Sequence, residues 1–285
     1  MVLCPGKLSW SGALSIRLIV AAPLLALAPA VALAADVGAQ DADPRADELS
    51  RLERLVQRLH DFETVIAAGG KIEPSYEGSD EFKISPIPYA SMTFYDRITL
   101  DVTGVSAKVV ELGPFSLYGK VGYDTGRSED ESDALDGLGD VDFGVTVGGR
   151  IEAAFGVFTA FAEVDKTLGG SDGLTGTGGL EVNYALRRWL RLGAEASATV
   201  ADENYMDAYF GIDASQSQRS GYERYDPDAG LKRLDLKATA TVAFSENWFV
   251  RGEAGVGLLV GDAADSPIVK NELQPSVMLV LGYRF

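Results

Sequence analysis

The sequence has almost no cysteine or histidine. Cys4 and His60 are the single examples of each among 285 residues. One cysteine forms neither an internal disulfide nor a cysteine-rich zinc site, and one histidine leaves little scope for histidine-dependent acid–base or nucleophilic catalysis. We therefore predict that the protein is not an enzyme and has no catalytic residue, no metal site and no cofactor.

Positive charge is also scarce. Lys and Arg total 25 against 42 for Asp and Glu, which gives a formal net charge of −17. Nucleic acid binding needs a basic face that neutralises phosphates, so this charge balance excludes nucleic acid as a partner. Hydrophobic residues make up 46% and charged residues 24% of the chain, a composition that fits neither a disordered chain nor a helical membrane protein.

The chain contains one long apolar run, Leu18–Leu33. Lys7 and Arg17 come before it, residues 1–35 include no acidic residue, and the run closes on Ala32-Leu33-Ala34, a pattern that signal peptidase accepts. We predict a signal peptide over residues 1–35. No later apolar stretch approaches the ~20 residues that a membrane helix needs, so the exported chain is periplasmic, secreted or an outer-membrane barrel.

Residues 36–63 are predicted to be a periplasmic segment that starts polar and ends in a short helix. Over 45–63 the apolar residues fall at helical spacing and charged residues occupy the other faces; the apolar positions are Leu49, Leu52, Leu55, Val56 and Leu59. Three interpretations stay open: a helix packed on the barrel mouth, a short coiled coil, or a helix that docks a partner.

From residue 64 to 285 the hydrophobic period changes to two. In 189–200, for example, Leu190 and Leu192 alternate with Arg191 and Gly193. Apolar residues on alternate positions in segments of about ten residues are typical of a transmembrane β-barrel. A soluble sandwich alternates in the same way, so the alternation alone does not separate the two folds.

Turns and aromatic residues favour the barrel. Predicted short connections (154–156, 187–188, 245–247) alternate with long polar ones (126–139, 168–177, 203–229, 261–272), as in bacterial outer-membrane barrels. Aromatic side chains lie beside the short turns, where a membrane interface would hold them. The last strand ends in Leu279, Leu281, Tyr283 and Phe285, which resembles the assembly signal read by the barrel assembly machinery. We predict an all-β, antiparallel transmembrane barrel over 64–285.

The number of strands follows from the requirement that it be even. Ten strands are clear, and both chain ends are expected in the periplasm, so the total must be even. In segment 97–111 the apolar parity reverses at Gly104, between Leu100 or Val102 on one side and Val105 or Ala107 on the other. A bulge there would give an odd count. We therefore predict two short strands and a total of twelve, with ten as the alternative.

Charged residues supply the remaining sequence candidates. Loop 128–142 is rich in Asp and Glu but does not match a calcium-binding loop, so we interpret it as a solvated external loop near lipopolysaccharide and outer-membrane lipid. Inward positions carry both signs, including Arg150 and Arg251. Such charges pair across a narrow lumen, which favours a closed barrel; a small selective pore is the alternative.

Several segments resemble the MltA-interacting protein (MipA/OmpV) family of Gram-negative outer-membrane proteins. They run in order along the chain and are Pro74-Ser75-Tyr76-Glu77-Gly78-Ser79-Asp80, Pro86-Ile87-Pro88, Asn204-Tyr205-Met206, Tyr209-Phe210-Gly211-Ile212, Gly261–Val269 and Tyr283-Arg284-Phe285. The helix at 45–63 is a departure from the family as we know it. The family-defining positions are Tyr76, Asp80, Tyr205, Phe210, Ser266 and Pro267, and a role in loop structure and rim packing is the alternative interpretation of each.

The resemblance implies a function without catalysis. It suggests an outer-membrane scaffold, with its N-terminal segment in the periplasm, that links a lytic transglycosylase to a penicillin-binding peptidoglycan polymerase in murein assembly. The alternative is a small pore, or a surface receptor or adhesin that uses the long loops.

Overall fold

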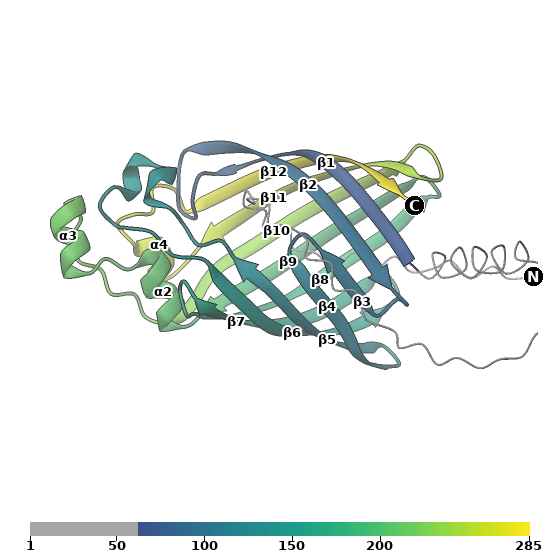
Figure 1. Cartoon of the computed structure of the whole chain (residues 1–285), viewed down its shortest axis with the longest axis horizontal. Coiled ribbons are helices and arrows are strands. Elements are labelled where there is room, and N and C mark those ends of the chain that lie inside the picture. The colour runs from purple at the N-terminus through teal and green to yellow at the C-terminus, as the bar shows by residue number, and fades with distance from the viewer. Residues whose placement is uncertain (1–61) are drawn as a thin grey trace, which may run out of the picture.

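A computed structural model describes residues 62–285 as one closed barrel of twelve antiparallel strands (Figure 1). The predicted signal peptide (1–35), the polar segment and helical residues from 36 to 61, and His60 lie outside the described residues. Twelve strands confirm the sequence prediction, and the ten-strand alternative is wrong. No helix within 62–285 has the length and apolar character needed to cross a bilayer.

The strands follow one another around the wall in chain order. They are β1 (Phe62–Pro74), β2 (Phe82–Phe94), β3 (Ile98–Asp101), β4 (Gly104–Leu112), β5 (Phe115–Asp124), β6 (Gly144–Phe155), β7 (Phe158–Gly169), β8 (Leu174–Arg187), β9 (Leu190–Ala201), β10 (Gly230–Ala243), β11 (Trp248–Leu259) and β12 (Leu273–Arg284). Pairing of β1 with β12, from Val65↔Arg284 to Ile72↔Val277, closes the barrel.

The first strand begins at Phe62, two residues before the predicted barrel boundary. Phe62 and Glu63 therefore belong to β1 and not to the N-terminal segment that the sequence predicted over 36–63. Phe62 pairs with Phe94 of the neighbouring strand β2, and the Glu63 carboxylate lies 3.2 Å from the Arg284 guanidinium of β12. These pairings extend the sheet to the very start of the described chain.

The outward face of the wall is apolar. Leu236, Leu279 and Ile84 are 60%, 60% and 78% exposed, whereas the alternate positions point into the barrel and are charged or small. A ring of large apolar side chains with no protein cover identifies the outward face as the surface that contacts lipid. The predicted assembly-signal residues Leu279, Leu281 and Phe285 are exposed on this face. Tyr283 packs edge to face against both Trp248 and Phe285.

The two ends of the barrel differ. The turn end carries both ends of the described chain and the short connections 95–97, 113–114, 156–157, 188–189 and 244–247. The loop end carries 75–81, 125–143, 202–229 and 260–272. The β7–β8 connection is also short, at 170–173, so the predicted long loop over 168–177 is wrong: Leu168 and Gly169 end β7, and residues 174–177 begin β8 and pair with residues 163–166 of β7.

Strands β3 and β4 form a hairpin that is shorter than its neighbours. The turn between them, Val102–Thr103, lies immediately before Gly104, where the sequence pattern reverses. Gly104 has φ = +143°, and a Cβ there would lie 2.1 Å from the carbonyl oxygen of Val121 on β5. Only glycine fits this turn, because the backbone conformation and the close approach both exclude a side chain.

We expect Gly104→Ala to lower the free energy of unfolding by about 3 kcal/mol or more, since backbone strain and a steric clash add together. Gly113→Ala is the matched control. Gly113 also has a positive φ, +60°, but its Cβ would meet nothing within 4 Å, so a loss of about 1 kcal/mol is expected. Urea titration of the bilayer-folded barrel, followed by tryptophan fluorescence, measures both. Equal losses would contradict the assignment of Gly104.

Candidate functional site

The four long connections at the loop end pack into a single cap over the barrel mouth. We call residues 75–81, 125–143, 202–229 and 260–272 the cap; the helices labelled α2, α3 and α4 in Figure 1 belong to it. Two apolar clusters hold it together. One includes Met206, Phe210 and Leu259, and the other includes Leu135 and Ile268, all of them almost fully buried. The cap is thus a packed substructure with its own core.

Short helices inside the cap begin at side-chain caps. Asp202 accepts a hydrogen bond from the Tyr205 N–H and starts α2 (Glu203–Phe210). Asp213 and Gln216 form a reciprocal capping box at the start of α3 (Ala214–Ser220). Such caps satisfy N–H groups that a helix start leaves unpaired. The remaining elements are η1 (Glu129–Glu131), η2 (Asp133–Leu135) and α4 (Asp262–Asp265).

The cap brings together five of the six family-defining positions. The Tyr76 hydroxyl donates to the Ile268 carbonyl at 2.8 Å. The Ser266 hydroxyl donates to the Phe210 carbonyl at 2.6 Å. Tyr76, Phe210 and Ser266 are buried, and Pro267 follows Ser266 and is partly buried. These contacts join the β1–β2 turn, α2 and the β11–β12 connection. Such roles agree with rim packing.

Tyr205, the fifth position, stands in a chain of aromatic and charged contacts. Its ring stacks on Tyr209, with 4.5 Å between centroids, and lies 4.5 Å from the Lys232 ammonium. The Tyr209 hydroxyl donates to Asp124 at 2.7 Å. Asp80, the sixth position, is exposed in the β1–β2 turn and belongs to no apolar cluster described here.

The most strongly perturbed charge in the cap is Glu77, which the sequence interpretation did not select. Its carboxylate accepts from Lys232 at 2.9 Å and from Arg233 at 3.3 Å. Burial alone would raise the pKa of Glu77, but the attraction of Lys232 and Arg233 outweighs it and lowers the pKa to about 2. Lys232 is itself 6% exposed, so each charge depends on the other for compensation.

A β-bulge explains how two consecutive residues reach Glu77. The β9–β10 register shifts between Leu231 and Arg233, which leaves Lys232 as the extra residue. In a regular strand Lys232 and Arg233 would point to opposite faces, whereas a bulge turns both inward. The sequence carried a trace of it, because the outward leucines Leu231 and Leu234 are three residues apart instead of two or four.

Inside the barrel many inward charges form ion pairs along the wall, within one strand or between strands at most two apart, whereas the sequence predicted pairs across the lumen. Arg150 is 9% exposed, and its guanidinium lies 3.9 Å from the centre of the Phe161 ring. The ion pairs of the wall include Arg150 with Glu152, Glu163 and Glu181, Lys120 with Glu163 and Asp165, Lys237 with Glu195, Arg251 with Glu253, Lys71 with Glu73, and Arg233 with Asp235. A pairing network of this kind satisfies buried charges without a bound ion.

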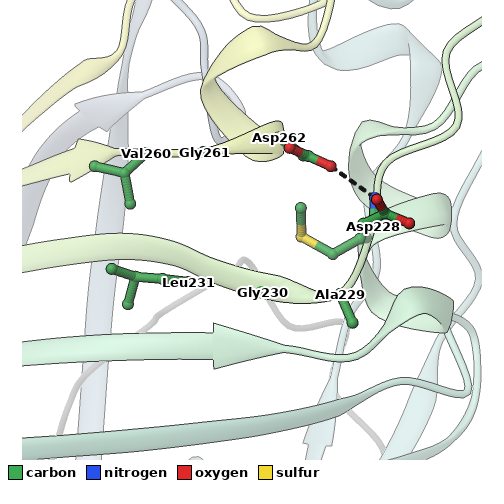
Figure 2. Close-up of a pocket in the computed structure, with 8 residues that line it drawn as sticks. Asp228, Ala229, Gly230, Leu231, Val260, Gly261 and Asp262 are labelled. Carbon is green, nitrogen blue, oxygen red and sulfur yellow. Dashed lines mark hydrogen bonds between the residues drawn. The ribbon is translucent and has the colours of Figure 1, made fainter.

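A recess of about 350 Å³ lies where the cap meets β10 and β11 (Figure 2). Its acidic side chains are Asp228 and Asp262, and the Asp262 carboxylate already accepts from the Asp228 N–H at 2.8 Å. Across residues 62–285, no three acidic, histidine or cysteine side chains converge as a metal site would require, in loop 128–142 or elsewhere. The chemistry of the cap is therefore that of packing and charge compensation.

Comparison with known proteins agrees with this geometry. Residues 66–285 match the family model described as MltA-interacting protein MipA. MltA-interacting proteins of Escherichia coli K12 and Shigella flexneri are each 27% identical over 136 residues, which cover 45% of this chain and 53% of each relative. The chain thus spans about half the length of the curated relatives it matches.

Solved outer-membrane proteins are similar in outline. An outer membrane channel from Pseudomonas putida F1 is 13% identical, with a TM-score of 0.43, over 79% of this chain and 94% of that one. OmpT of Vibrio cholerae is 10% identical, with a TM-score of 0.36, over 79% and 97%.

The Glu77 ion pair predicts a pH-dependent cap. Because the folded pKa of about 2 lies below the usual 4.5, the stabilisation is complete above pH 4.5 and is lost as the pH falls from 4.5 towards 2. Glu77→Gln should cost about 2–3 kcal/mol at neutral pH and flatten the dependence of stability on pH in that window. Urea midpoints at pH 7 and pH 3 measure both effects.

Glu223→Gln is the matched control, since Glu223 is an exposed cap residue and its change removes the same charge. It should leave the midpoint and the pH dependence as they are. If Glu77→Gln and the unaltered chain lose stability in parallel below pH 4.5, Glu77 is not the group responsible.

Proposed function

The chain belongs to the MltA-interacting protein MipA family of outer-membrane barrels, and on that premise we propose that it is a non-enzymatic scaffold for murein enzymes. The observation that carries the proposal is the family match over the whole barrel together with a relative from Escherichia coli that is named for its interaction with MltA. Because only half of that relative is matched, the partners are part of the proposal.

The chemistry of the chain supports a role without catalysis. Residues 62–285 contain neither histidine nor cysteine, and Glu77 and many inward charges of the wall are held in ion pairs. Buried groups with complete pairing stabilise a structure but are poorly placed to exchange protons with a substrate. A scaffold requires a stable surface, which a barrel and a packed cap provide.

We propose the turn end as the partner-binding surface, because short turns of bacterial barrels face the periplasm and murein lies there. The exposed Arg188 in the β8–β9 turn, next to Arg187 at the end of β8, places positive charge on this end of a chain with net charge −17. Complementary charge on a partner would speed association and orient it. The N-terminal segment from residue 36 is proposed to lie on the same side.

The test is capture by the folded protein. Detergent-folded barrel is immobilised and exposed to a Gram-negative envelope extract, with a heat-unfolded sample as the reference, and bound proteins are identified by mass spectrometry. We expect the folded form alone to recover a lytic transglycosylase or a penicillin-binding polymerase. Recovery of neither would contradict the scaffold.

A charge reversal then locates the surface. Arg188→Glu at the turn end should weaken capture several-fold, whereas Arg224→Glu, an exposed arginine of the cap at the opposite end, should not. Equal capture by both variants would remove the β8–β9 turn from the binding surface. Deletion of residues 36–61, with the signal peptide kept, tests the N-terminal segment in the same assay.

A small selective pore is the second candidate function, because charged side chains line the lumen. Arg251 and Glu253 face inward and lie 3.4 Å apart. In a conducting barrel, Arg251→Glu should shift ion selectivity towards cations, measured as the reversal potential across a planar bilayer under a salt gradient. A barrel that shows no conductance in either form would exclude the pore.

A further inference from the structure

The short β3–β4 hairpin leaves one part of the wall incomplete. β3 pairs only with Ser91–Phe94 of β2, and β4 reaches only to Gly122 of β5. Within the described residues, 82–90 of β2 therefore form a ladder with β1 but with no strand on the other side. Figure 1 shows β3 and β4 confined to the turn end, beside the C-terminus. We call this opening between β2 and β5 the lateral notch.

The open edge of β2 carries two prolines. The Glu81 carbonyl accepts from Ser75 of β1, and the Phe94 carbonyl accepts from Arg97 on the β3 side. Because successive residues of a strand direct their backbone groups to opposite sides, odd positions of β2 face β1 and even positions face the notch. Pro86 and Pro88 are even. The two central positions of the open edge thus have no N–H group to leave unpaired.

The prolines also indicate whether the notch contacts a protein strand or lipid. A strand that added to β2 would need N–H donors from this edge, and proline removes them. In hydrocarbon the same absence is favourable, since an unpaired N–H there costs several kcal/mol. Ile84 and Ala90 keep N–H groups on this edge, but its middle, at Pro86 and Pro88, has no donor and is therefore better suited to lipid than to a protein strand.

The notch is continuous with the lipid-contacting surface. Ile84, 78% exposed, points outward from β2, and Pro86 and Pro88 are exposed on the same face. Phe82 and Phe143, 52% and 59% exposed, flank the notch at its loop end. Bilayer hydrocarbon therefore reaches the open edge without crossing a polar barrier.

Polar contacts between side chains and backbone groups hold the two ends of the notch. At the loop end Lys83 of β2 lies 3.3 Å from Glu131 of η1, and Ser132 donates to Glu81 at 2.9 Å. At the opposite limit the Tyr123 hydroxyl of β5 donates to the Val102 carbonyl in the β3–β4 turn. The opening is thus held between the cap and the hairpin.

The inward face beside the notch carries an apolar cluster and, towards the loop end, an ion pair between Lys71 and Glu73 of β1 opposite Ser85 and Lys83 of β2. Ala67 of β1, Ile87 of β2, and Met278 and Val280 of β12 form one buried cluster, with Tyr89 packed against it. Ile87 is 1% exposed. An apolar surface inside the wall, next to an opening onto hydrocarbon, can contact an acyl chain from the inner side.

We propose that the lateral notch is a lipid site, in which the acyl chain of a membrane lipid from the loop-end leaflet enters the barrel wall between β2 and β5. The chain contacts the edge at Pro86 and Pro88, which have no N–H group, and extends towards the apolar cluster around Ile87. The site is independent of the scaffold function, since it concerns the wall and not the turn end.

Fluorescence quenching by brominated lipid tests the site. In a Cys4→Ala background, Tyr89→Cys places a fluorescent label on an inward position beside the notch. Thr239→Cys is the inward control on a closed part of the wall, because β10 is paired on both sides there. Leu236→Cys, at a 60% exposed position, is the outward control. Each labelled barrel is folded into phosphatidylcholine vesicles brominated along the acyl chains.

We expect quenching at position 89 to approach that at 236 and to exceed that at 239 several-fold. Quenching no greater than at 239 would overturn the proposal. Stronger quenching of position 89 by aqueous iodide than by brominated lipid would show a water-filled opening, and no quenching by either would show a notch filled by protein; both results also overturn it.

A second labelled position tests whether the result at position 89 depends on a packing defect caused by the loss of Tyr89. Ser85→Cys faces inward from the same stretch of β2 and replaces a small side chain, so it disturbs packing less than the loss of Tyr89. Heat-modifiable migration in gels establishes folding before any quenching measurement. The same ranking of positions is expected with Ser85→Cys, and a failure to reproduce it would count against the lipid site.

Discussion

The outward face of the barrel contacts hydrocarbon, where a backbone N–H or C=O group finds no solvent partner. Each strand must therefore pair on both sides over most of its length, with β2 at the lateral notch as the exception, and the sheet has to return to its own first strand. Here that return is the ladder between β1 and β12, which joins Val65 to Arg284 and Ile72 to Val277. The alternation of side chains, the short turns and the ion pairs inside the wall all follow from this closure, since closure divides the chain into one face for lipid and one for the interior.

Charged side chains inside the barrel and cap lie away from bulk water and need partners of opposite charge. In the wall, Arg150 has three carboxylate partners from β6, β7 and β8. In the cap, Glu77 has two cationic partners from β10. In the wall the pairing joins neighbouring strands, and in the cap it joins residues that are distant in sequence, so charge compensation also sets how the cap sits on the barrel. The apolar clusters of the cap then exclude water from these contacts.

The alternation of inward and outward side chains along each strand allowed most of the wall to be predicted from the sequence. Lipid on one side and a lumen on the other force a period of two, and the reversal at Gly104 located the hairpin turn to within two residues. The same reasoning, applied to the three-residue spacing of Leu231 and Leu234, would have revealed the bulge at Lys232 and with it the partner of Glu77. Glycine-rich composition misled the prediction at 168–177, because Gly169 and Gly170, with φ of +80° and +59°, allow a tight turn and the residues on either side of 170–173 belong to β7 and β8. The packing of the cap was beyond prediction, since its contacts join loops with no shared periodicity. The family motifs marked Tyr76 and Phe210 but gave no information on what they touch.

The ladder between β1 and β12 also determines the order of events during biogenesis. The first strand made has to wait for the last, because its partner begins at Leu273 and ends at Arg284, next to the final residue of the chain. Until then the nascent sheet has two open edges and an uncovered apolar face, the state in which β-proteins associate wrongly with one another. A ribosome that stalls, or a protease that removes a dozen residues from the C-terminus, would therefore yield a product that cannot complete its wall. Whether β12 is present therefore decides whether such a chain can close its barrel.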